Sequence, residues 1–374
     1  MTDLTEIERR IDTLFVSPPY AAEPSLRLSN LLALLQDELE YAAARNPHFR
    51  NYLDNWPVDY PPAEAIADLP FLPVGACKAN PPLTLINTDE IKRILSSSAT
   101  TGQVPSRVFL DNATARRMTK GIITIIRDFI GSARRPFLVI DTSDKLSGEA
   151  ELGARGAAIQ GLIPFATETV CCLNGDTVTA PSLDLRKLMD CGQKWKQADV
   201  IVYGFTYVIW NYFVKPLESA GMKLDMPNVR VLHSGGWKRL EAQAVTKDMF
   251  AARVASVFGC SPKDVIDFYG MVENVGVVYP DCPYSNKHAP TFAEVIIRNP
   301  LTLQPVDVGE QGLVQVCSAL PTSFTGFLVL TEDIGEVVDY DNCPCGRRGI
   351  CFHFVKRVPK AELRGCGNMD VSRR

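Results

Sequence analysis

The sequence predicts an α/β fold in which helix-flanked β-sheets are followed by a small β-rich subdomain. Between about residues 100 and 215, short apolar runs alternate with stretches of helical apolar spacing, as they do in βαβ units. After about residue 290 the helical spacing gives way to short strands separated by turns, which favours an antiparallel sheet. At 374 residues the chain is long enough for one large or two medium domains.

Residues 1–90 are predicted to form a helical lead-in, because the leucines between Leu28 and Leu39 recur at helical spacing and proline pairs interrupt the segment that follows. Residues 91–290 are predicted to form an α/β core, residues 291–357 the β-rich subdomain and residues 358–374 a C-terminal tail. The expected elements of the core are strands at Val108–Leu110, Phe137–Ile140 and Val200–Tyr203 and helices through Ile122–Phe129 and Trp210. The expected strands of the subdomain are Ala293–Ile297, Leu313–Cys317, Phe327–Leu330, Glu336–Asp339 and Ile350–Val355.

The composition is that of a soluble globular protein, with 46% hydrophobic and 22% charged residues. Charged residues interrupt every apolar stretch before it could span a bilayer, so we expect no membrane span. With 39 basic and 43 acidic residues the net charge is −4, and we expect a small-molecule or protein partner and no nucleic acid. Eleven cysteines, two of them adjacent at Cys171 and Cys172, suit a reducing compartment, which makes the cytoplasm the expected location.

A loop rich in hydroxyl groups precedes the strand at Val108. The segment Ser96–Gly102 carries five serine or threonine side chains and one glycine in seven residues. Backbone N–H groups and hydroxyl donors in such a loop can wrap a phosphate chain, although an ordinary surface loop has the same composition. No Lys-Ser or Lys-Thr follows the glycine, so the segment is not a Walker loop.

Two further segments end apolar strands with polar side chains. Asp267–Glu273 presents an aromatic ring at Tyr269, which can flank a purine, and a carboxylate at Glu273, which can hold Mg²⁺ against phosphates. Thr331–Gly335 is expected to be a turn that offers the two acceptor oxygens of Asp333 to a vicinal diol such as ribose. Each segment could equally be an ordinary strand end or turn.

The segment His233–Lys238 follows a predicted strand at Val229–Leu232. Its two glycines, Gly235 and Gly236, would let a nucleotide base lie close to the backbone, and Lys238 is placed to meet a phosphate. Core packing of Trp237 and a solvated surface charge at Lys238 are the alternatives.

The order and spacing of these segments, about 170 and 60 residues from Gly102 to Glu273 and on to Asp333, resemble the core motifs of the adenylate-forming superfamily that includes acyl-CoA synthetases. Cys345-Gly346-Arg347 resembles the phenylacetate-CoA ligase branch. The closest likeness is to the acyl-protein synthetase group of LuxE type, and it runs from about residue 70 to the end of the chain. It is carried by Phe71–Pro73 ahead of Lys78, by Ser106–Val108 with Asp111, and by His233–Lys238.

This resemblance implies the large N-terminal domain of adenylate-forming enzymes and an activity in which ATP, with Mg²⁺, converts a carboxylic acid, expected to be a fatty acid, to an acyl-adenylate. Implied cofactor-binding residues are Ser97, Ser98, Thr100, Thr101 and Gly102 for the phosphates, Tyr269 with Gly270 for adenine, Asp333 and Arg357 for ribose, and Gly235, Gly236 and Trp237 near the base. Glu273 would hold Mg²⁺ and Lys238 would act in catalysis. Tyr203, Gly204, Phe205 and Thr206 would line the acid pocket. Ala99 and Glu332 stand where the family usually has glycine.

The chain ends 17 residues after Arg357, so the mobile C-terminal lid domain of the superfamily is expected to be absent. In its place the tail carries Cys366 between two glycines, and a thiolate is a good nucleophile toward an acyl-adenylate. The resemblance implies that Cys366 takes the acyl group as a thioester and delivers it to a partner protein such as an acyl reductase. A tail thiol without a role is the alternative.

A second cysteine group is predicted to be structural. Cys282, His288, Cys343 and Cys345 form a Cys3His set that suits tetrahedral zinc, all four are expected at turns, and Cys351 is a possible substitute ligand. Related phenylacetate-CoA ligase-like proteins carry zinc in this region.

Three functions therefore stay open at the level of sequence. The leading one is an acyl-protein synthetase that works through Cys366. The others are an adenylating ligase that transfers the acyl or aryl group directly to CoA, a carrier thiol or an amine, and a non-catalytic subunit that binds a nucleotide or an acyl group.

Overall fold

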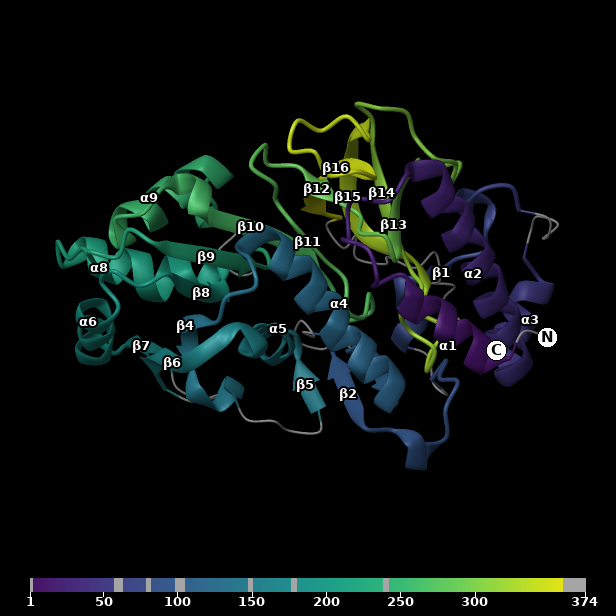
Figure 1. Ribbon diagram of the computed structural model, residues 1–374, viewed down its shortest axis with the longest axis horizontal. Coiled ribbons are helices and arrows are strands. Elements are labelled where there is room, and N and C mark those ends of the chain that lie inside the picture. The colour runs from purple at the N-terminus through teal and green to yellow at the C-terminus, as the bar shows by residue number, and fades with distance from the viewer. Residues whose placement is uncertain are drawn as a thin grey trace, which may run out of the picture.

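The computed structural model describes residues 3–56, 63–78, 82–97, 105–146, 151–175, 180–237 and 242–358. Figure 1 shows two lobes, each built around one large β-sheet, with the long helix α4 (Asn112–Ile130) running between them. No helix within these ranges combines the length and the apolar character needed to cross a membrane.

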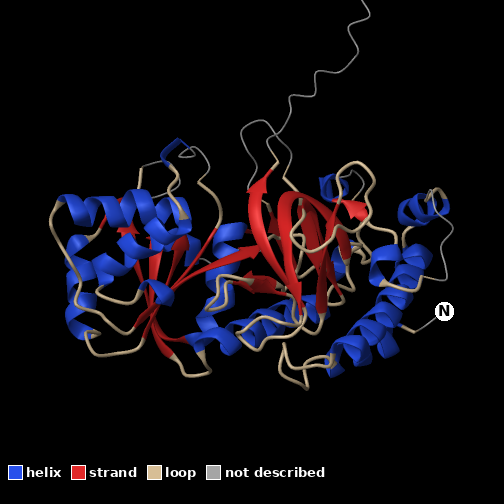
Figure 2. Ribbon diagram, turned by 90° about the horizontal axis from the view of Figure 1, so that it is seen from above, coloured by secondary structure: helices blue, strands red, loops and turns tan. Residues whose placement is uncertain are grey.

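The first lobe contains a seven-stranded sheet in the order β11-β10-β9-β8-β4-β6-β7. Its five central strands are parallel and its two edge strands are antiparallel. The central strands carry almost continuous apolar runs because helices cover both faces of the sheet (Figure 2). The strands are β4 (Arg135–Thr142), β6 (Ala166–Asn174), β7 (Ser182–Leu183), β8 (Val200–Phe205), β9 (Val229–Ser234), β10 (Val265–Gly270) and β11 (Val278–Pro280).

The helices of this lobe connect successive strands. They are α5 (Ala154–Leu162), α6 (Leu185–Lys194), α7 (Thr206–Ile209), α8 (Lys215–Ser219) and α9 (Lys247–Phe258), with a π-helical turn at Trp210–Val214 between α7 and α8. Shorter 3-10 turns lie at Ser143–Leu146, Ile163–Phe165 and Pro262–Asp264. The predicted strands and helices of the core are confirmed.

The winding of the sheet reverses at β4. From β4 the chain passes to β6 on one side and then returns to β8 on the other side of β4. Ligands of open α/β sheets bind outside the carboxyl ends of the strands at such a point. The carboxyl ends of β4 and β8 are therefore the first place to look for a substrate pocket.

A separate three-stranded sheet, in the order β3-β2-β5, carries the hydroxyl-rich loop. Strands β2 (Arg93–Ser96) and β3 (Arg107–Leu110) form an antiparallel hairpin, and β5 (Glu151–Gly153) runs parallel to β2. The hairpin is closed by Ser97, whose backbone N–H donates to the Ser106 carbonyl oxygen at 3.1 Å and whose Oγ accepts from the Ser106 N–H at 2.8 Å. Residues 98–104 of the loop lie outside the described residues.

The second lobe contains a six-stranded sheet in the order β12-β16-β15-β14-β13, with the short strand β1 also paired to β15. Every pair in the main path is antiparallel, as predicted. The strands are β1 (Leu72–Pro73), β12 (Lys287–His288), β13 (Ala293–Arg298), β14 (Gln311–Ser318), β15 (Leu328–Tyr340) and β16 (Ile350–Arg357).

One local prediction is wrong: Thr331–Gly335 is not a turn, and the strands expected at Phe327–Leu330 and Glu336–Asp339 are parts of the single strand β15. The inward-facing period of two continues through the polar residues, since Thr331, Asp333 and Gly335 are buried and their neighbours are less so. Gly335 serves close packing between strands, because a Cβ there would lie 2.8 Å from a Val314 methyl group and 3.0 Å from the His353 carbonyl oxygen.

The predicted helical lead-in consists of α1 (Leu4–Thr13), α2 (Pro24–Arg45) and α3 (Pro47–Asp54), followed by 3-10 turns at Ile66–Asp68, Val74–Lys78 and Thr88–Glu90. These helices pack on the six-stranded sheet and share its hydrophobic core. A buried ion pair between Arg27 and Glu294 joins α2 to β13. The first and the last parts of the described chain thus form one lobe, although the sequence places them some 200 residues apart.

Candidate adenylation site and cysteine–histidine cluster

Tyr269, Asp333 and Arg357, predicted to bind one nucleoside, are neighbours in the structure. Tyr269 lies near the end of β10, and its hydroxyl donates to Asp333 Oδ2 at 2.8 Å. Asp333 on β15 stands opposite Arg357 on β16, with 3.7 Å between Arg357 Nε and Asp333 Oδ1. Burial raises the pKa of Asp333, while the Tyr269 hydroxyl and the Arg357 charge act in the opposite direction. The carboxylate therefore accepts a hydrogen bond from Tyr269 and lies beside the Arg357 charge, at the junction of the two lobes.

The ring of Tyr269 belongs to an aromatic group. It stacks with Tyr279 at 5.9 Å between ring centroids and with Phe354 at 5.2 Å, and the whole residue is only 9% exposed. Protein atoms thus cover most of the ring, and its predicted contact with adenine stays a prediction. Gly270, the next residue, ends β10.

Glu273 lies in the turn that follows β10 and is 5% exposed. Burial raises the pKa of Glu273, and Ser106, Arg357 and Lys78 counteract that rise. Ser106 closes the hairpin that carries the hydroxyl-rich loop, so the structure brings Glu273 to the base of this loop. Such a buried carboxylate beside a candidate phosphate loop fits the predicted Mg²⁺ ligand, because a hard cation prefers carboxylate oxygen.

Lys78 was noted in the sequence only as part of a family resemblance, yet its charge acts on Glu273. The adjacent Cys77 thiol has its pKa raised to about 12 by burial and by the Glu273 charge. Both residues belong to the 3-10 turn that follows β1, and no pattern in the sequence indicates that this turn lies beside Glu273. Strand pairing between β1 and β15 carries them to the site.

The glycine segment follows directly after β9, and the chain bends at Gly235, whose φ is positive at 78°. Trp237 packs edge-on against Trp210, with 5.4 Å between ring centroids, and also meets Phe250. This contact agrees with core packing, the alternative considered for Trp237. Lys238 lies outside the described residues, as do Ser98, Thr100, Thr101, Gly102 and Cys366.

The four residues predicted to line an acid pocket stand at the carboxyl end of β8 and in the first turn of α7, beside the point where the sheet reverses. Tyr203, Phe205 and Thr206 are buried. The Tyr203 hydroxyl lies 3.2 Å from Ser234 Oγ, and Thr206 Oγ1 lies 3.0 Å from His233 Nδ1. A Cβ on Gly204 would come within 2.9 Å of Ile209, so the backbone is closely packed here. Their role in acid binding remains a prediction.

A buried group of charged residues, which the sequence analysis did not identify, includes Asp267 of β10. The ammonium of Lys287 is fully buried, 3.1 Å from Asp267 Oδ2 and 2.8 Å from Asp281 Oδ1. Lys247 pairs with the same two aspartates at 3.2 and 3.0 Å. Burial would raise the pKa of Asp267, but the charges of Lys287, His233 and Lys247 lower it overall. This ion cluster of two lysines and two aspartates fixes the strand that leads to Tyr269 and Glu273.

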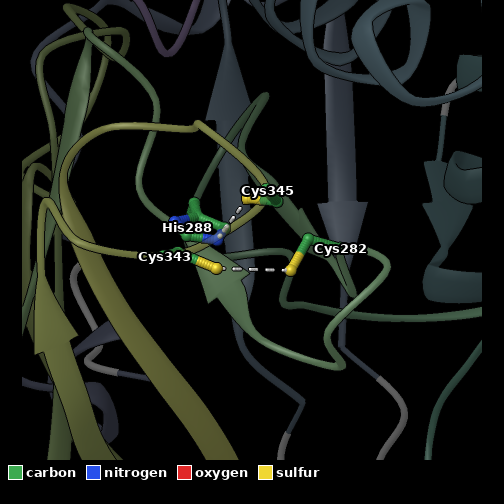
Figure 3. A group of neighbouring side chains, drawn as sticks. All are labelled: Cys282, His288, Cys343 and Cys345. Carbon is green, nitrogen blue, oxygen red and sulfur yellow. Dashed lines mark hydrogen bonds between the residues drawn. The ribbon is translucent and has the colours of Figure 1, made fainter.

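The predicted Cys3His set comes together in the second lobe (Figure 3). The candidate ligand atoms of Cys282, His288, Cys343 and Cys345 all lie within 4.8 Å of one another. Cys282 follows β11, and Cys343 and Cys345 lie between β15 and β16. His288, expected at a turn, belongs instead to the short strand β12. Cys351 lies in the same buried cluster but outside these four.

The spacing of this cluster fits tetrahedral zinc. Zn–S bonds of about 2.3 Å at tetrahedral angles place two sulfurs about 3.8 Å apart, and Cys282 Sγ and Cys343 Sγ are 3.8 Å apart. Cys345 Sγ and His288 Nε2 are 3.4 Å apart. Burial raises the pKa of Cys282 to about 12 and lowers that of His288 to about 4. At neutral pH the imidazole is therefore uncharged and able to bind a cation, and the Cys282 thiol would release its proton to solvent when a cation binds.

Solved structures define the class of the fold as that of adenylate-forming ligases. The chain is similar to 2-hydroxyisobutyryl-CoA ligase in an open conformation with 2-HIB-AMP and CoA, with a TM-score of 0.69 and 15% identity over 91% of this chain and 77% of that chain. The chain is also similar to the same ligase in its postadenylation state, with a TM-score of 0.67 and 15% identity over 91% of this chain and 68% of that chain.

The chain belongs to the LuxE acyl-protein synthetase family, whose model matches residues 4–372. It is 24% identical to the long-chain-fatty-acid–luciferin-component ligase of Vibrio harveyi over 371 residues, 97% of this chain and 92% of that protein. The enzyme of the same name from Aliivibrio fischeri is 23% identical over 89% of this chain and 85% of that protein. The protein is therefore a ligase that activates acyl groups, and the fold inferred from its sequence is confirmed.

Proposed function

We propose that this ligase uses ATP and Mg²⁺ to convert a fatty acid to an acyl-adenylate and then transfers the acyl group to its own Cys366. The observation that carries the proposal is that Ser97, at the start of the hydroxyl-rich loop, lies in the same part of the structure as the segments Asp267–Glu273 and Thr331–Gly335. Ser97, Glu273 and Asp333 are spread over more than 200 residues of the chain. The Ser106 N–H donates to Ser97 Oγ and closes the hairpin, and Val272, next to Glu273, packs in one hydrophobic cluster with Leu95 and Val108 of that hairpin. The Tyr269 hydroxyl donates to Asp333. The relatives' names support a long-chain fatty acid as the substrate.

In the first step an oxygen of the acid's carboxylate attacks the α-phosphorus of ATP, and pyrophosphate leaves. Asp333 and Arg357 would bind the ribose, and the loop that begins at Ser97 would hold the phosphates. Mg²⁺ at Glu273 would neutralise charge on the phosphates as pyrophosphate leaves. Catalysis then consists mainly of positioning and charge stabilisation.

In the second step the Cys366 thiolate attacks the acyl carbonyl carbon, the bond from this carbon to the AMP oxygen breaks, and AMP leaves. Cys366 is the ninth residue after Arg357. A flexible segment of this length spans about 16 Å on average and at most about 30 Å when extended. This reach supports transfer within one molecule. A partner protein such as an acyl reductase would then take the acyl group from the thioester.

The Cys3His cluster is proposed to hold a structural Zn²⁺ that contributes to folding and takes no part in the chemistry. Its ligands close a tetrahedral site, which leaves no open position for a substrate. The zinc would tie the segment after β11 to the segment between β15 and β16, close to the strands that carry Asp333 and Arg357.

The test is incubation of the purified protein with Mg-ATP and radiolabelled fatty acids, with pyrophosphate and protein-bound label measured together. The wild type is expected to release pyrophosphate and to retain a hydroxylamine-labile label. Cys366→Ala should release pyrophosphate but retain no label, whereas the matched control Cys260→Ala, altered at a cysteine that belongs to none of the predicted motifs, should behave as the wild type.

Each other result rejects part of the proposal. Pyrophosphate release without label on the wild type would favour direct transfer to CoA, a carrier thiol or an amine. Label that survives in Cys366→Ala would place the acyl group on another residue. No pyrophosphate with any acid would support a subunit that only binds a nucleotide or an acyl group.

A further inference from the structure

A paired arginine at the reversal point of the large sheet has no part in the site described so far. Arg155 lies in the first turn of α5, and its Nε donates to Asp141 Oδ2 at 2.6 Å while its Nη2 donates to Asp141 Oδ1. Asp141 is buried near the carboxyl end of β4. This two-pronged contact fixes the plane of the guanidinium group.

The position of Arg155 links the two halves of the proposed site. Gly153, two residues before it, pairs with Ser96 at the foot of the hydroxyl-rich loop. On its other side Nη1 of Arg155 reaches the Tyr207 hydroxyl at 3.4 Å, and the charge of Arg155 acts on Tyr203. Arg155 thus lies between the candidate phosphate loop and the carboxyl end of β8, where the acid and the α-phosphate would have to meet.

The guanidinium group retains hydrogen-bonding capacity. Of its five N–H donors, two meet Asp141 and one reaches Tyr207; the others meet no acceptor within the described part of the chain. The Arg155 side chain is 24% exposed, while its partner Asp141 is 3% exposed. Among the residues that the structure describes, none places an atom within 4 Å of a Cβ built on Gly153, so none of them fills the space beside the backbone next to Arg155.

We propose that the guanidinium group of Arg155, held in place by Asp141, binds the carboxylate of the acid substrate. This inference rests on the proposed function and deepens it. The residues at the end of β8 are buried, and an anionic carboxylate that leaves water to bind there needs a donor that remains charged at every working pH. A guanidinium can hold Asp141 on one edge and a second carboxylate on another, which a lysine ammonium does less well.

The role is that of orientation. Arg155 would hold the carboxylate oxygen that remains as the carbonyl oxygen of the acyl-adenylate and leave the other oxygen free to attack the α-phosphorus. No proton is transferred to or from Arg155. A charged hydrogen bond of this kind is expected to favour the acid over an uncharged analogue by about 10- to 100-fold.

The test compares equilibrium binding of dodecanoate and dodecanol, which share one alkyl chain, by titration calorimetry without ATP. The wild type should prefer dodecanoate, Arg155→Gln should lose that preference, and Arg155→Lys should retain part of it. Arg116→Gln, altered at an exposed arginine on α4, should bind both compounds as the wild type does. Thermal unfolding of each variant identifies any that fail to fold.

Pyrophosphate release, measured on the same proteins, separates this inference from the proposed function. Release by the wild type together with an unchanged preference in Arg155→Gln would reject the role of Arg155 and leave adenylation standing. A preference lost in Arg155→Gln without release by the wild type would keep this role and reject adenylation. A wild type that binds dodecanol as tightly as dodecanoate would overturn the inference outright.

Discussion

Replacing Lys287 with methionine should destabilise the protein far more than the same change at Lys247. Both lysines contact Asp267 and Asp281, but the Lys287 side chain is fully buried, whereas that of Lys247 is 50% exposed. Removal of one partner from a buried ion pair costs about 3–5 kcal/mol. Because Lys247 still neutralises both aspartates, we expect about 3 kcal/mol for Lys287→Met. Methionine keeps most of the apolar volume, so the loss reports on charge. For Lys247→Met we expect about 1 kcal/mol.

Urea unfolding followed by tryptophan fluorescence measures both variants, and equal m-values would show that the unfolded states are comparable. The folded-state pKa of Asp267 lies below its unfolded value, so its contribution to stability is present above about pH 4 and is lost as the pH falls through the folded pKa. The difference between wild type and Lys287→Met should shrink over the same range. If Lys287→Met lost no more stability than Lys247→Met, the ion cluster would not have the strength that its burial implies.

Three further results are expected. Elemental analysis should find about one zinc per chain, and Cys345→Ser should bind less zinc and unfold at a lower temperature; full zinc content in that variant would contradict the ligand assignment. Asp333→Asn should raise the KM for ATP about 10-fold or more and leave the KM for the acid unchanged, and equal increases in both would argue against ribose binding. Glu273→Gln should raise the Mg²⁺ concentration needed for half-maximal rate. Burial raises the pKa of Glu273, so the Mg²⁺ affinity of the wild type should fall as the pH falls through that pKa. Glu273→Gln should lack this pH dependence. If its Mg²⁺ affinity still fell at low pH, the titrating group would be another residue.

The sequence predicted the architecture well where apolar periodicity was regular. The runs that became β4 and β8 are almost wholly apolar because both faces of the parallel sheet are covered. The prediction failed in β15, where Glu332, Asp333 and Gly335 have the composition of a turn. The inward-facing residues Thr331, Asp333 and Gly335 are polar or small. The alternation of inward and outward residues therefore does not show in the hydrophobicity pattern, although the strand maintains it.

The candidate site was predictable where function depends on residue type. Cys282, His288, Cys343 and Cys345 were named together because thiols and imidazoles are recognisable metal ligands. Lys287 and Arg155 carried no such signal, since a charged residue in a polar or small-residue segment is normally solvated. Only the tertiary fold shows that Lys287 is enclosed with two aspartates and that Arg155 faces Asp141.

The two-residue strand β12 has a consequence for how this protein can vary. Lys287 points into the ion cluster and its neighbour His288 into the cysteine group, because successive strand residues face opposite ways. Loss or gain of a single residue between Cys282 and Lys287 would reverse the face of both side chains, turning Lys287 toward the cysteine side of the strand and His288 toward the side of the ion cluster. The length of this short connection is therefore constrained as strictly as the identity of the side chains at either end, and homologues that keep both clusters should tolerate substitutions here but no insertions or deletions.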